Sequence, residues 1–249
     1  NITKEQYARI EKHFPVQRGN VKIDNYTFIN AILYIAEKDA NGGHFQKNTA
    51  NGTAYTKDLR DDVKAGNTGV FNALQQEKII SVKVEVLALD STSCKLHPDA
   101  HGALKNTGSN PLENQKAMER QASRGIANDK VIVEMHLSGG NCHDAPQGRT
   151  SIEYIGSSYS GVPILMDRAY EGNKTRELCQ SFGHDPVVPP KKNRLDPWEY
   201  DQDLYKQRNI IERLFRWLKA FRRVCTRYDK LDLIFLSFIQ IACIVTWLK

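Results

Sequence analysis

The clearest alternation of apolar and polar positions lies between residues 201 and 223, in the last quarter of the chain. Its apolar side chains recur at helical spacing and fall on one side of a helix: Ile210, Ile211, Leu214, Trp217, Leu218 and Phe221. The opposite side holds a single carboxylate, Glu212, among a tyrosine and four cations: Tyr205, Arg208, Arg216, Lys219 and Arg223. The pattern predicts one long amphipathic helix that begins near Asp201.

The polar side of this helix has two interpretations. A carboxylate flanked by cations is what a metal ligand that meets a phosphodiester requires. A solvated helix face with ion pairs between successive turns gives the same spacing. The sequence of this segment alone leaves both open.

Residues 1–38 carry a helical pattern in two parts. Thr3 and Gln6 form a capping-box pair at the start of the first helix. A second helix is predicted from about Asp24 to Lys38. Two short helices on a basic chain are compatible with a DNA-binding appendage or with a small structural cap. Residues 39–68, which are rich in Asn, Gly and Thr, carry few large apolar side chains.

A series of strands is predicted after a short helix over residues 69–77. An apolar strand is predicted over residues 82–89 and ends at Asp90, and residues 97–124 are polar enough to predict a loop. A strand over residues 130–137 is the only clear one between Arg124 and His143. A second strand of this region is either lost, cryptic or supplied by residues before Arg124.

The alternation of strands and helices continues toward the C-terminus. A buried strand over residues 161–166 ends at Asp167, a helix covers about residues 173–182, and a short strand covers residues 187–190. The alternation predicts an α/β fold with a mixed sheet and covering helices. The final apolar run, residues 231–248, is long enough to cross a bilayer. Because Asp232, Ser237 and Gln240 interrupt it, a buried C-terminal helix is favoured over a membrane span.

Three carboxylates are placed to converge in such a fold. Asp90 and Asp167 each follow an apolar strand, and Glu212 comes from the long helix. Three neighbouring carboxylates repel one another unless divalent cations neutralise them, and Mg²⁺ or Mn²⁺ prefers such oxygen ligands. A lone carboxylate at a strand end is more often a polar cap than a catalytic group.

The charge distribution indicates a class of binding partner, and the cysteine content indicates the redox compartment. The formal net charge is +6, from 35 Lys and Arg against 29 Asp and Glu. Much of the excess lies in residues 204–230, and a clustered basic stretch is typical of nucleic-acid binding. The five cysteines form no C-x-x-C pair, which argues against a zinc site and fits a reducing compartment. The N-terminal residues show no signal-peptide pattern, and because the chain begins at Asn1 without a methionine, an initiator residue or a longer start is expected upstream.

The spacing Y-(2)-R-(3)-E-(6)-K in residues 205–219 resembles the signature of DDE transposases of insertion sequences 4 and 5. Further blocks resemble the insertion sequence 5 group in the same order along the chain: LALDSTSCKLHPDAHGALKNTG, CHDAPQGR, ILMDRAYEGN, VVPPKKNR and RRVCTRYDKL. The resemblance implies a ribonuclease H-like DDE catalytic domain over residues 81–249. Residues 1–80 are expected to form a small helical N-terminal region, and DNA binding is the role predicted for it from its two short helices. His143 and Asp144 lie in one of these blocks without an assigned role.

The resemblance also implies a reaction and its participants. Asp90, Asp167 and Glu212 would be the catalytic residues and would hold Mg²⁺, or Mn²⁺ as a substitute, as two ions. Tyr205, Arg208 and Lys219 would bind DNA; Arg216 and Arg223 are added from their helical phase alone.

Water would hydrolyse a phosphodiester at the transposon end, and the freed 3′-hydroxyl would then attack target DNA. The partners would be double-stranded DNA, as terminal inverted repeats and target, and a second copy of the chain in a homodimer. The expected location is the bacterial cytoplasm, in association with the nucleoid, with no membrane. Two alternatives are a decayed or repurposed copy that binds DNA without catalysis and a ribonuclease H-like nuclease.

Overall fold

The computed structural model describes residues 1–14, 24–38, 84–100, 118–126, 132–140 and 142–248. The chain forms two compact units. The first comprises Asn1–Ser81, Leu96–Leu104 and Leu218–Lys249, and the second comprises Val82–Lys95 and Lys105–Trp217. The predicted helix over residues 69–77 and the polar stretch 39–68 lie outside the described residues.

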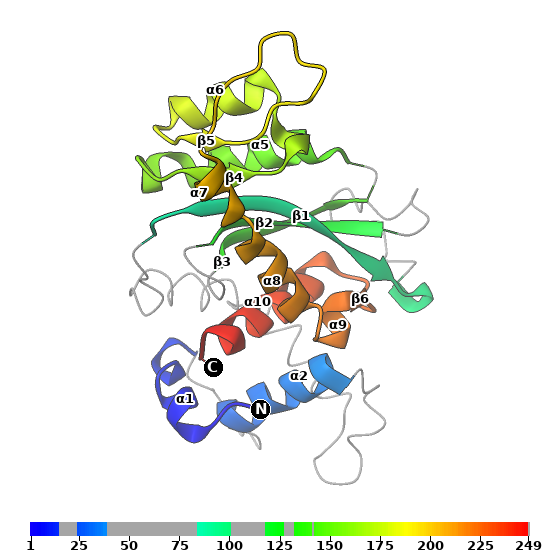
Figure 1. The fold of residues 1–249 in the computed structure, drawn as a ribbon. Helices are drawn as coiled ribbons and strands as arrows, with labels where there is room; N and C mark the ends of the chain where they lie inside the picture. Colours follow the sequence, from blue (N-terminus) through cyan, green and yellow to red (C-terminus); the bar gives the residue numbers. More distant parts are fainter. Residues whose placement is uncertain (15–23, 39–83, 101–117, 127–131, 141, 249) are drawn as a thin grey trace. The chain divides into compact units, whose positions relative to one another are not determined.

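The second unit contains a mixed β-sheet (Figure 1), in the strand order β3-β2-β1-β4-β5. The strands are β1 (Leu87–Leu96), β2 (Met118–Ile126), β3 (Ile132–Gly139), β4 (Ile164–Met166) and β5 (Pro186–Val187). Strands β1, β2 and β3 form an antiparallel meander, whereas β4 pairs in parallel with both β1 and β5. A mixed sheet with helices was predicted, and this coarse fold class is confirmed.

Strand β2 corrects the prediction that residues 97–124 form a loop. Its nine residues are mostly polar and show no alternation, so the sequence carries no strand signal. The strand lies between β1 and β3 and pairs with both, with Ser123 opposite Asp90 on one side and Met135 on the other. Two ladders of backbone hydrogen bonds therefore fix the segment, which shows how tertiary context overrides propensity. The second strand is thus supplied largely by residues before Arg124.

Strand β1 also differs from its prediction, because it continues past Asp90 to Leu96. The apolar run ends at Asp90, but pairing with β2 extends from Leu89 to Lys95. Asp90 therefore lies inside a strand, whereas it was predicted to lie at a strand end. Asp167 directly follows β4, as predicted.

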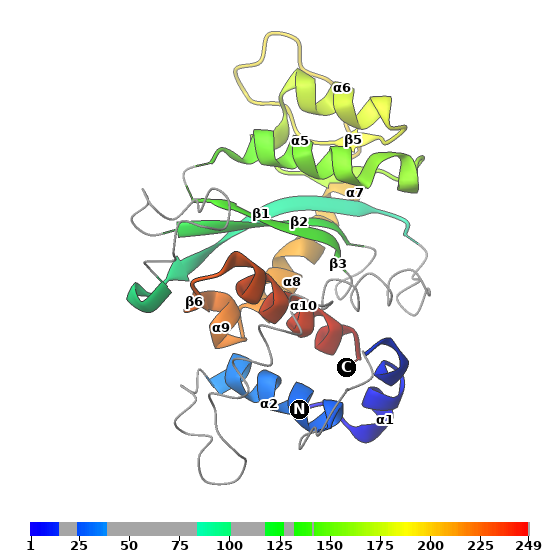
Figure 2. The ribbon, with the colours of Figure 1, turned by 180° about the vertical axis from the view of Figure 1, so that it is seen from behind.

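Helices α5 (Asp144–Ile155) and α6 (Asn173–Ser181) contact each other and lie on one face of the sheet, and α8 lies on the other (Figures 1 and 2). The sequence prediction omitted α5, whose Pro146 and Gly148 are poor helix formers. Pro146 is tolerated because it lies in the first turn, where the amide has no helical partner. The core between these layers includes Leu87, Leu89, Ile152, Ile164, Met166 and Cys179.

The predicted long helix after Asp201 is two helices, α7 (Gln202–Lys206) and α8 (Asn209–Leu218). Asp201 caps α7 by accepting the amides of Asp203 and Leu204. At the break, the backbone amides of residues 207, 208, 210 and 211 bond three residues back, which tightens the turn. The apolar side of α8 is buried as predicted at Ile211, Leu214 and Leu218.

The first unit contains helices from both ends of the chain. They are α1 (Lys4–Ala8), α2 (Asn25–Lys38), α9 (Arg222–Cys225) and α10 (Asp232–Leu248), with η1 (Glu11–His13) and η3 (Pro98–Ala100). The Thr3–Gln6 capping box is confirmed in both directions. Helix α10 packs against α2 and α9, so its prediction as a buried helix is confirmed. Within the described residues, no helix combines the length and the apolar character that a bilayer crossing requires.

Candidate active site

Two of the predicted carboxylates are brought side by side by the parallel pairing of β1 with β4. Leu89 is the register partner of Met166, and Asp90 and Asp167 are the next residues on the two strands. Both carboxylates are fixed by nearby backbone amides. Asp90 Oδ1 accepts the amide of Ser91 at 2.8 Å, and Asp167 Oδ1 accepts the amide of Ala169 at 2.7 Å.

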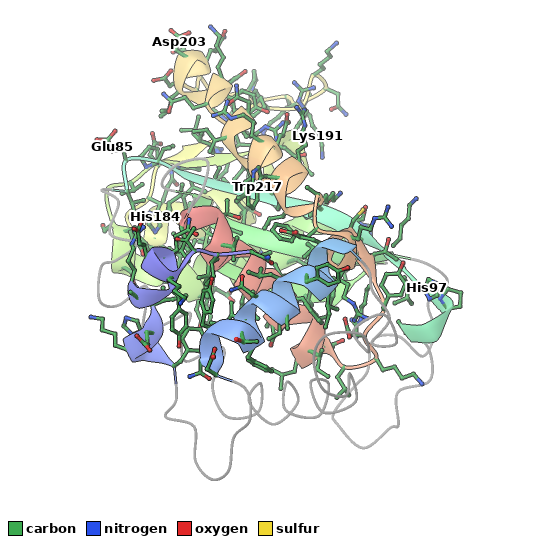
Figure 3. The ribbon with its side chains drawn as sticks, turned by 90° about the horizontal axis from the view of Figure 1, so that it is seen from below. Glu85, His97, His184, Lys191, Asp203 and Trp217 are labelled. Atoms are coloured by element: carbon green, nitrogen blue, oxygen red, sulfur yellow. The ribbon has the colours of Figure 1, made fainter. Side chains whose placement is uncertain are left out.

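Glu212 is linked to this pair through Arg208. The Arg208 guanidinium donates from Nη1 to Asp90 Oδ2 at 3.0 Å, and from Nη2 to Glu212 Oε1. Arg208 lies in the break between α7 and α8. In Figure 3, the labels Asp203 and Trp217 mark these two helices. The side chain of Asp90 is 18% exposed and that of Glu212 is 53% exposed. Arg208 thus bridges a largely buried carboxylate of the sheet and a solvent-facing carboxylate of α8.

The charges of these groups affect one another. The pKa of Asp90 is raised to about 6, with burial as the largest cause and the negative charges of Asp167 and Glu212 as smaller ones in the same direction. The Ser91 amide and the Arg208 guanidinium oppose this rise. Burial lowers the pKa of Arg208, but the surrounding negative groups, with Asp90 first, leave it above its ordinary value. Arg208 is therefore charged at neutral pH.

The elevated pKa of Asp90 predicts a pH-dependent stability. The folded pKa of about 6 lies above the ordinary 3.8, so this group favours folding below pH 3.8 and the contribution is lost as pH rises through 6. The free energy of unfolding of Asp90→Asn should exceed that of the parent increasingly from pH 4 to pH 7, by at most about 3 kcal/mol. Denaturant unfolding of both proteins without metal at each pH measures the difference. A difference that is constant with pH contradicts the assigned cause.

The donor chemistry of this site fits a divalent cation. Asp90, Asp167 and Glu212 offer only oxygen, which suits Mg²⁺ and Mn²⁺. Across the described ranges, no three acidic, histidine or cysteine side chains are arranged so that they could hold a metal ion. The guanidinium of Arg208 occupies both Asp90 Oδ2 and Glu212 Oε1. Arg208 thus holds one oxygen of each of two carboxylates that were predicted to bind a metal ion.

The other predicted DNA-binding residues are distributed over both units. Tyr205 in α7 lies edge-on to Tyr200, with ring centroids 5.6 Å apart, and its ring is 6.0 Å from the Arg208 guanidinium. Arg216 is exposed one turn after Glu212 on α8. Lys219, just after α8, and Arg223 belong to the first unit. The structure thus brings Tyr205, Arg208 and Arg216 near Glu212 along the α7–α8 segment.

Part of the basic stretch at residues 204–230 is used internally. Arg223 pairs with Asp229 at 3.0 Å and lies over the ring of Phe238. Arg227 is fully buried and pairs with Asp232 at 2.7 Å. These contacts give Arg223 and Arg227 a role in the packing of the first unit, which the count of cations in the sequence does not reveal.

A second charged cluster lies four residues after Asp167. Glu171 is buried and pairs with Lys191 at 3.3 Å and with Arg194 at 2.8 Å; Lys191 is marked in Figure 3. The guanidinium of Arg194 lies 4.4 Å from the ring centroid of Trp198. These contacts anchor the loop that follows β5 to the segment after Asp167.

Three further polar residues beside Asp90 were missed by the sequence analysis as members of the site. The Ser91 hydroxyl donates to Asp144 Oδ1 at 2.6 Å, and the Tyr170 side chain hydrogen-bonds Ser91. Burial is the largest cause of a raised Tyr170 pKa, and the charges of Asp90, Asp144 and Asp167 add to it. Each residue lies in a sequence block that was already singled out, but only the fold reveals that the blocks meet.

A family model described as the transposase DDE domain matches residues 83–247. The chain is similar to a Brucella ovis protein that is named as a transposase for insertion sequence element IS6501. The two are 29% identical over 112 residues, which are 44% of this chain and 83% of that protein. A protein of Burkholderia cepacia, assigned in the same way to element IS402, is 25% identical over 150 residues, which are 57% of this chain and 68% of that protein.

The fold is similar to that of a solved transposase structure. The piggyBac transposase, determined in a synaptic complex with hairpin DNA, gives a TM-score of 0.53 over 98% of this chain and 70% of its own, at 10% identity. At that identity the likeness concerns the fold alone.

Proposed function

The chain belongs to the transposase DDE domain family and is a transposase of the bacterial insertion-sequence type, and from this premise we propose how it acts. It cleaves DNA at the ends of its element and joins the freed 3′-hydroxyl to target DNA. Its fold is ribonuclease H-like, and it belongs to the insertion sequence 5 group with the Y-R-E-K signature at Tyr205, Arg208, Glu212 and Lys219.

Asp90, Asp167 and Glu212 are the catalytic carboxylates in this proposal. The observation that carries it is the register of β1 with β4, which sets Asp90 beside Asp167, together with the Arg208 bridge to Glu212. These residues would hold two Mg²⁺ ions, or Mn²⁺ in their place, and such ions would supply charge stabilisation for the attacking and leaving oxygens of an in-line phosphoryl displacement.

The remaining residues bind and orient DNA. Arg208 leaves the carboxylates for a phosphate oxygen, where its planar guanidinium can donate twice. Arg216 on the exposed side of α8 and Lys219 just after it contact further phosphates; Arg223, which was also predicted to do so, would first have to leave Asp229. Tyr205 donates its hydroxyl to a phosphate or stacks its ring on a displaced base.

The domain arrangement and the partners are also part of the proposal. Residues 1–80 bind DNA, and residues 81–249 form the catalytic domain. Two element ends must be held together during the reaction, which favours a homodimer. The DNA partners are the terminal inverted repeats and the target, in the bacterial cytoplasm with the nucleoid.

Metal-dependent nicking of supercoiled plasmid tests this function, because it does not require the natural DNA ends. The parent chain should nick plasmid in Mn²⁺ and should not do so in chelator. A preformed 3′-hydroxyl end should then be joined to the plasmid by the same protein.

Either alternative function gives a different result. Plasmid that is shifted but never nicked supports a copy that binds without catalysis. Nicking without any joining, across a series of 3′-hydroxyl substrates, supports a nuclease.

A further inference from the structure

Ser91 connects the Asp90 carboxylate to a second polar group through two of its own atoms. Its backbone amide donates to Asp90 Oδ1 at 2.8 Å, while its hydroxyl donates to Asp144 Oδ1 at 2.6 Å. Asp144 begins α5, so this contact joins strand β1 to the start of a helix from a distant part of the sequence. The torsions of Ser91 are thus restrained from both its backbone and its side chain.

Tyr170 extends this link from the opposite direction. It lies in η6 (Arg168–Tyr170), is 1% exposed, and its side chain hydrogen-bonds Ser91. A serine hydroxyl has one hydrogen to donate and two lone pairs that accept. The Ser91 hydroxyl therefore lies between Asp144, to which it donates, and the Tyr170 side chain.

The space for the Tyr170 ring is made by a glycine on α5. A Cβ placed on Gly148 would lie 2.5 Å from Tyr170 Cε1 and 2.6 Å from Cδ1. A glycine inside a helix is less favourable than alanine, typically by about 1 kcal/mol. The close approach of the ring gives this position a packing reason. The chain of hydrogen bonds is therefore supported by the shape of the interior as well as by polar contacts.

The Asp90 carboxylate is consequently held in one orientation. Its Oδ1 faces the Ser91 amide, and its Oδ2 faces the cationic group of Arg208. We propose that Tyr170, Ser91 and Asp144 are positioning residues, whose hydrogen-bond chain fixes Asp90 with Oδ2 directed toward a bound divalent cation. This inference rests on the proposed function, because it assumes that Asp90 is a metal ligand.

The measurement is Mn²⁺ affinity without DNA, from the electron paramagnetic resonance signal of free Mn²⁺. Ser91→Ala removes the hydroxyl but keeps the amide that holds Asp90. Loss of a group that orients a metal ligand typically weakens binding 10–100-fold, and we expect about tenfold here. Ser93→Ala is the matched control, since Ser93 lies two residues on in β1 and on the same side of the strand. It should bind Mn²⁺ as the parent does.

Two substitutions of Asp144 distinguish the effect of its hydrogen bond to Ser91 from the effect of its negative charge. Asp144→Asn keeps an oxygen that accepts the Ser91 hydroxyl, so its Mn²⁺ affinity should stay within about threefold of the parent. Asp144→Ala loses the acceptor and should resemble Ser91→Ala. Tyr170→Phe keeps the ring and should also weaken binding. Neither Tyr170→Phe nor Asp144→Ala should have a further effect in the Ser91→Ala background, because the chain is already broken there.

Gly148→Ala tests the position of Tyr170 without removing any polar atom from Tyr170, Ser91 or Asp144. Gly148→Ala would displace the Tyr170 ring, and we expect a melting temperature lower by roughly 2–10 °C together with weaker Mn²⁺ binding. Without that contact, the same substitution would stabilise the helix and raise the melting temperature.

Two results would overturn the inference, and they can be told apart. If Ser91→Ala melts about 1–6 °C lower but binds Mn²⁺ as Ser93→Ala does, the chain is only structural. If the parent itself binds no Mn²⁺, or binds it unchanged in Asp90→Asn, the metal site of the proposed function is wrong and the inference falls with it.

Discussion

Replacement of Glu212 by glutamine should reduce plasmid nicking by about 10³-fold or more, which corresponds to ~4 kcal/mol of lost transition-state stabilisation. Glutamine has nearly the same shape but carries no negative charge to bind a divalent cation. The fold should be unaffected, because the Glu212 side chain is 53% exposed and pairs with Arg208 only one helical turn away. A loss of this size therefore reports on chemistry and not on unfolding.

DNA binding should respond in the opposite direction. Removal of a negative charge beside phosphate-binding cations lowers repulsion, so the shift of plasmid in a gel should be equal to or stronger than that of the parent. Glu153→Gln is the matched control, because Glu153 is exposed on α5 and makes the same change of charge. Nicking should be unchanged in that variant. Equal losses in both variants, or full activity in Glu212→Gln, would remove Glu212 from the catalytic set.

The sequence predicted those parts of the fold in which a local pattern and the final structure agree. The Thr3–Gln6 capping box and helices α2, α6 and α10 each carry their own signal in capping residues or apolar spacing. Strand β4 is likewise a short apolar run before Asp167. In these elements, the residues that form the structure are those that bury its apolar side.

The errors occur where tertiary contacts decide the outcome. Strand β2 is polar and is fixed by pairing on both sides, and β1 continues through polar residues because β2 lies against it. Helix α5 contains a proline and a glycine, although its buried positions 148, 151, 152 and 155 do follow helical spacing. The break between α7 and α8 contains Arg208, whose guanidinium reaches Asp90.

The site shows the same division. The resemblance supplied Asp90, Asp167 and Glu212, and the register of β1 with β4 brings the first two together. A helical projection placed Arg223 beside Arg208, but Arg223 lies in a separate helix and pairs with Asp229. Ser91, Asp144 and Tyr170 come from three separate sequence blocks. These three residues are far apart in the sequence, and no spacing predicts that they meet. They come together only when α5 and η6 pack beside β1.

Replacement of Arg208 by alanine should have two effects of opposite sign. Without DNA, Mn²⁺ should bind more tightly, by about tenfold, because Asp90 Oδ2 and Glu212 Oε1 lose the cation that occupies them. With DNA, nicking should fall by about 10²-fold, because a phosphate loses a bidentate partner in the proposed complex. Calorimetric titration with Mn²⁺ and plasmid nicking measure the two effects separately.

Arg216→Ala is the matched control for this separation. It removes the same charge from the same segment, but Arg216 is exposed and lies beyond the carboxylates on α8. Both variants should weaken DNA binding and reduce the slope of log affinity against log salt by about one. Only Arg208→Ala should change Mn²⁺ affinity in the absence of DNA.

Arg208→Lys tests whether the planar shape of the guanidinium, and not only its charge, lets one side chain bind both carboxylates. Lysine keeps the charge but presents a compact ammonium, which cannot donate in parallel to Asp90 and Glu212 as a planar guanidinium does. Its Mn²⁺ affinity should lie between those of the parent and Arg208→Ala. If all three proteins bind Mn²⁺ equally, Arg208 does not compete for the carboxylates. The ion pairs of Arg208 would then contribute only to the stability of the DNA-free protein, and metal binding would not be coupled to its departure.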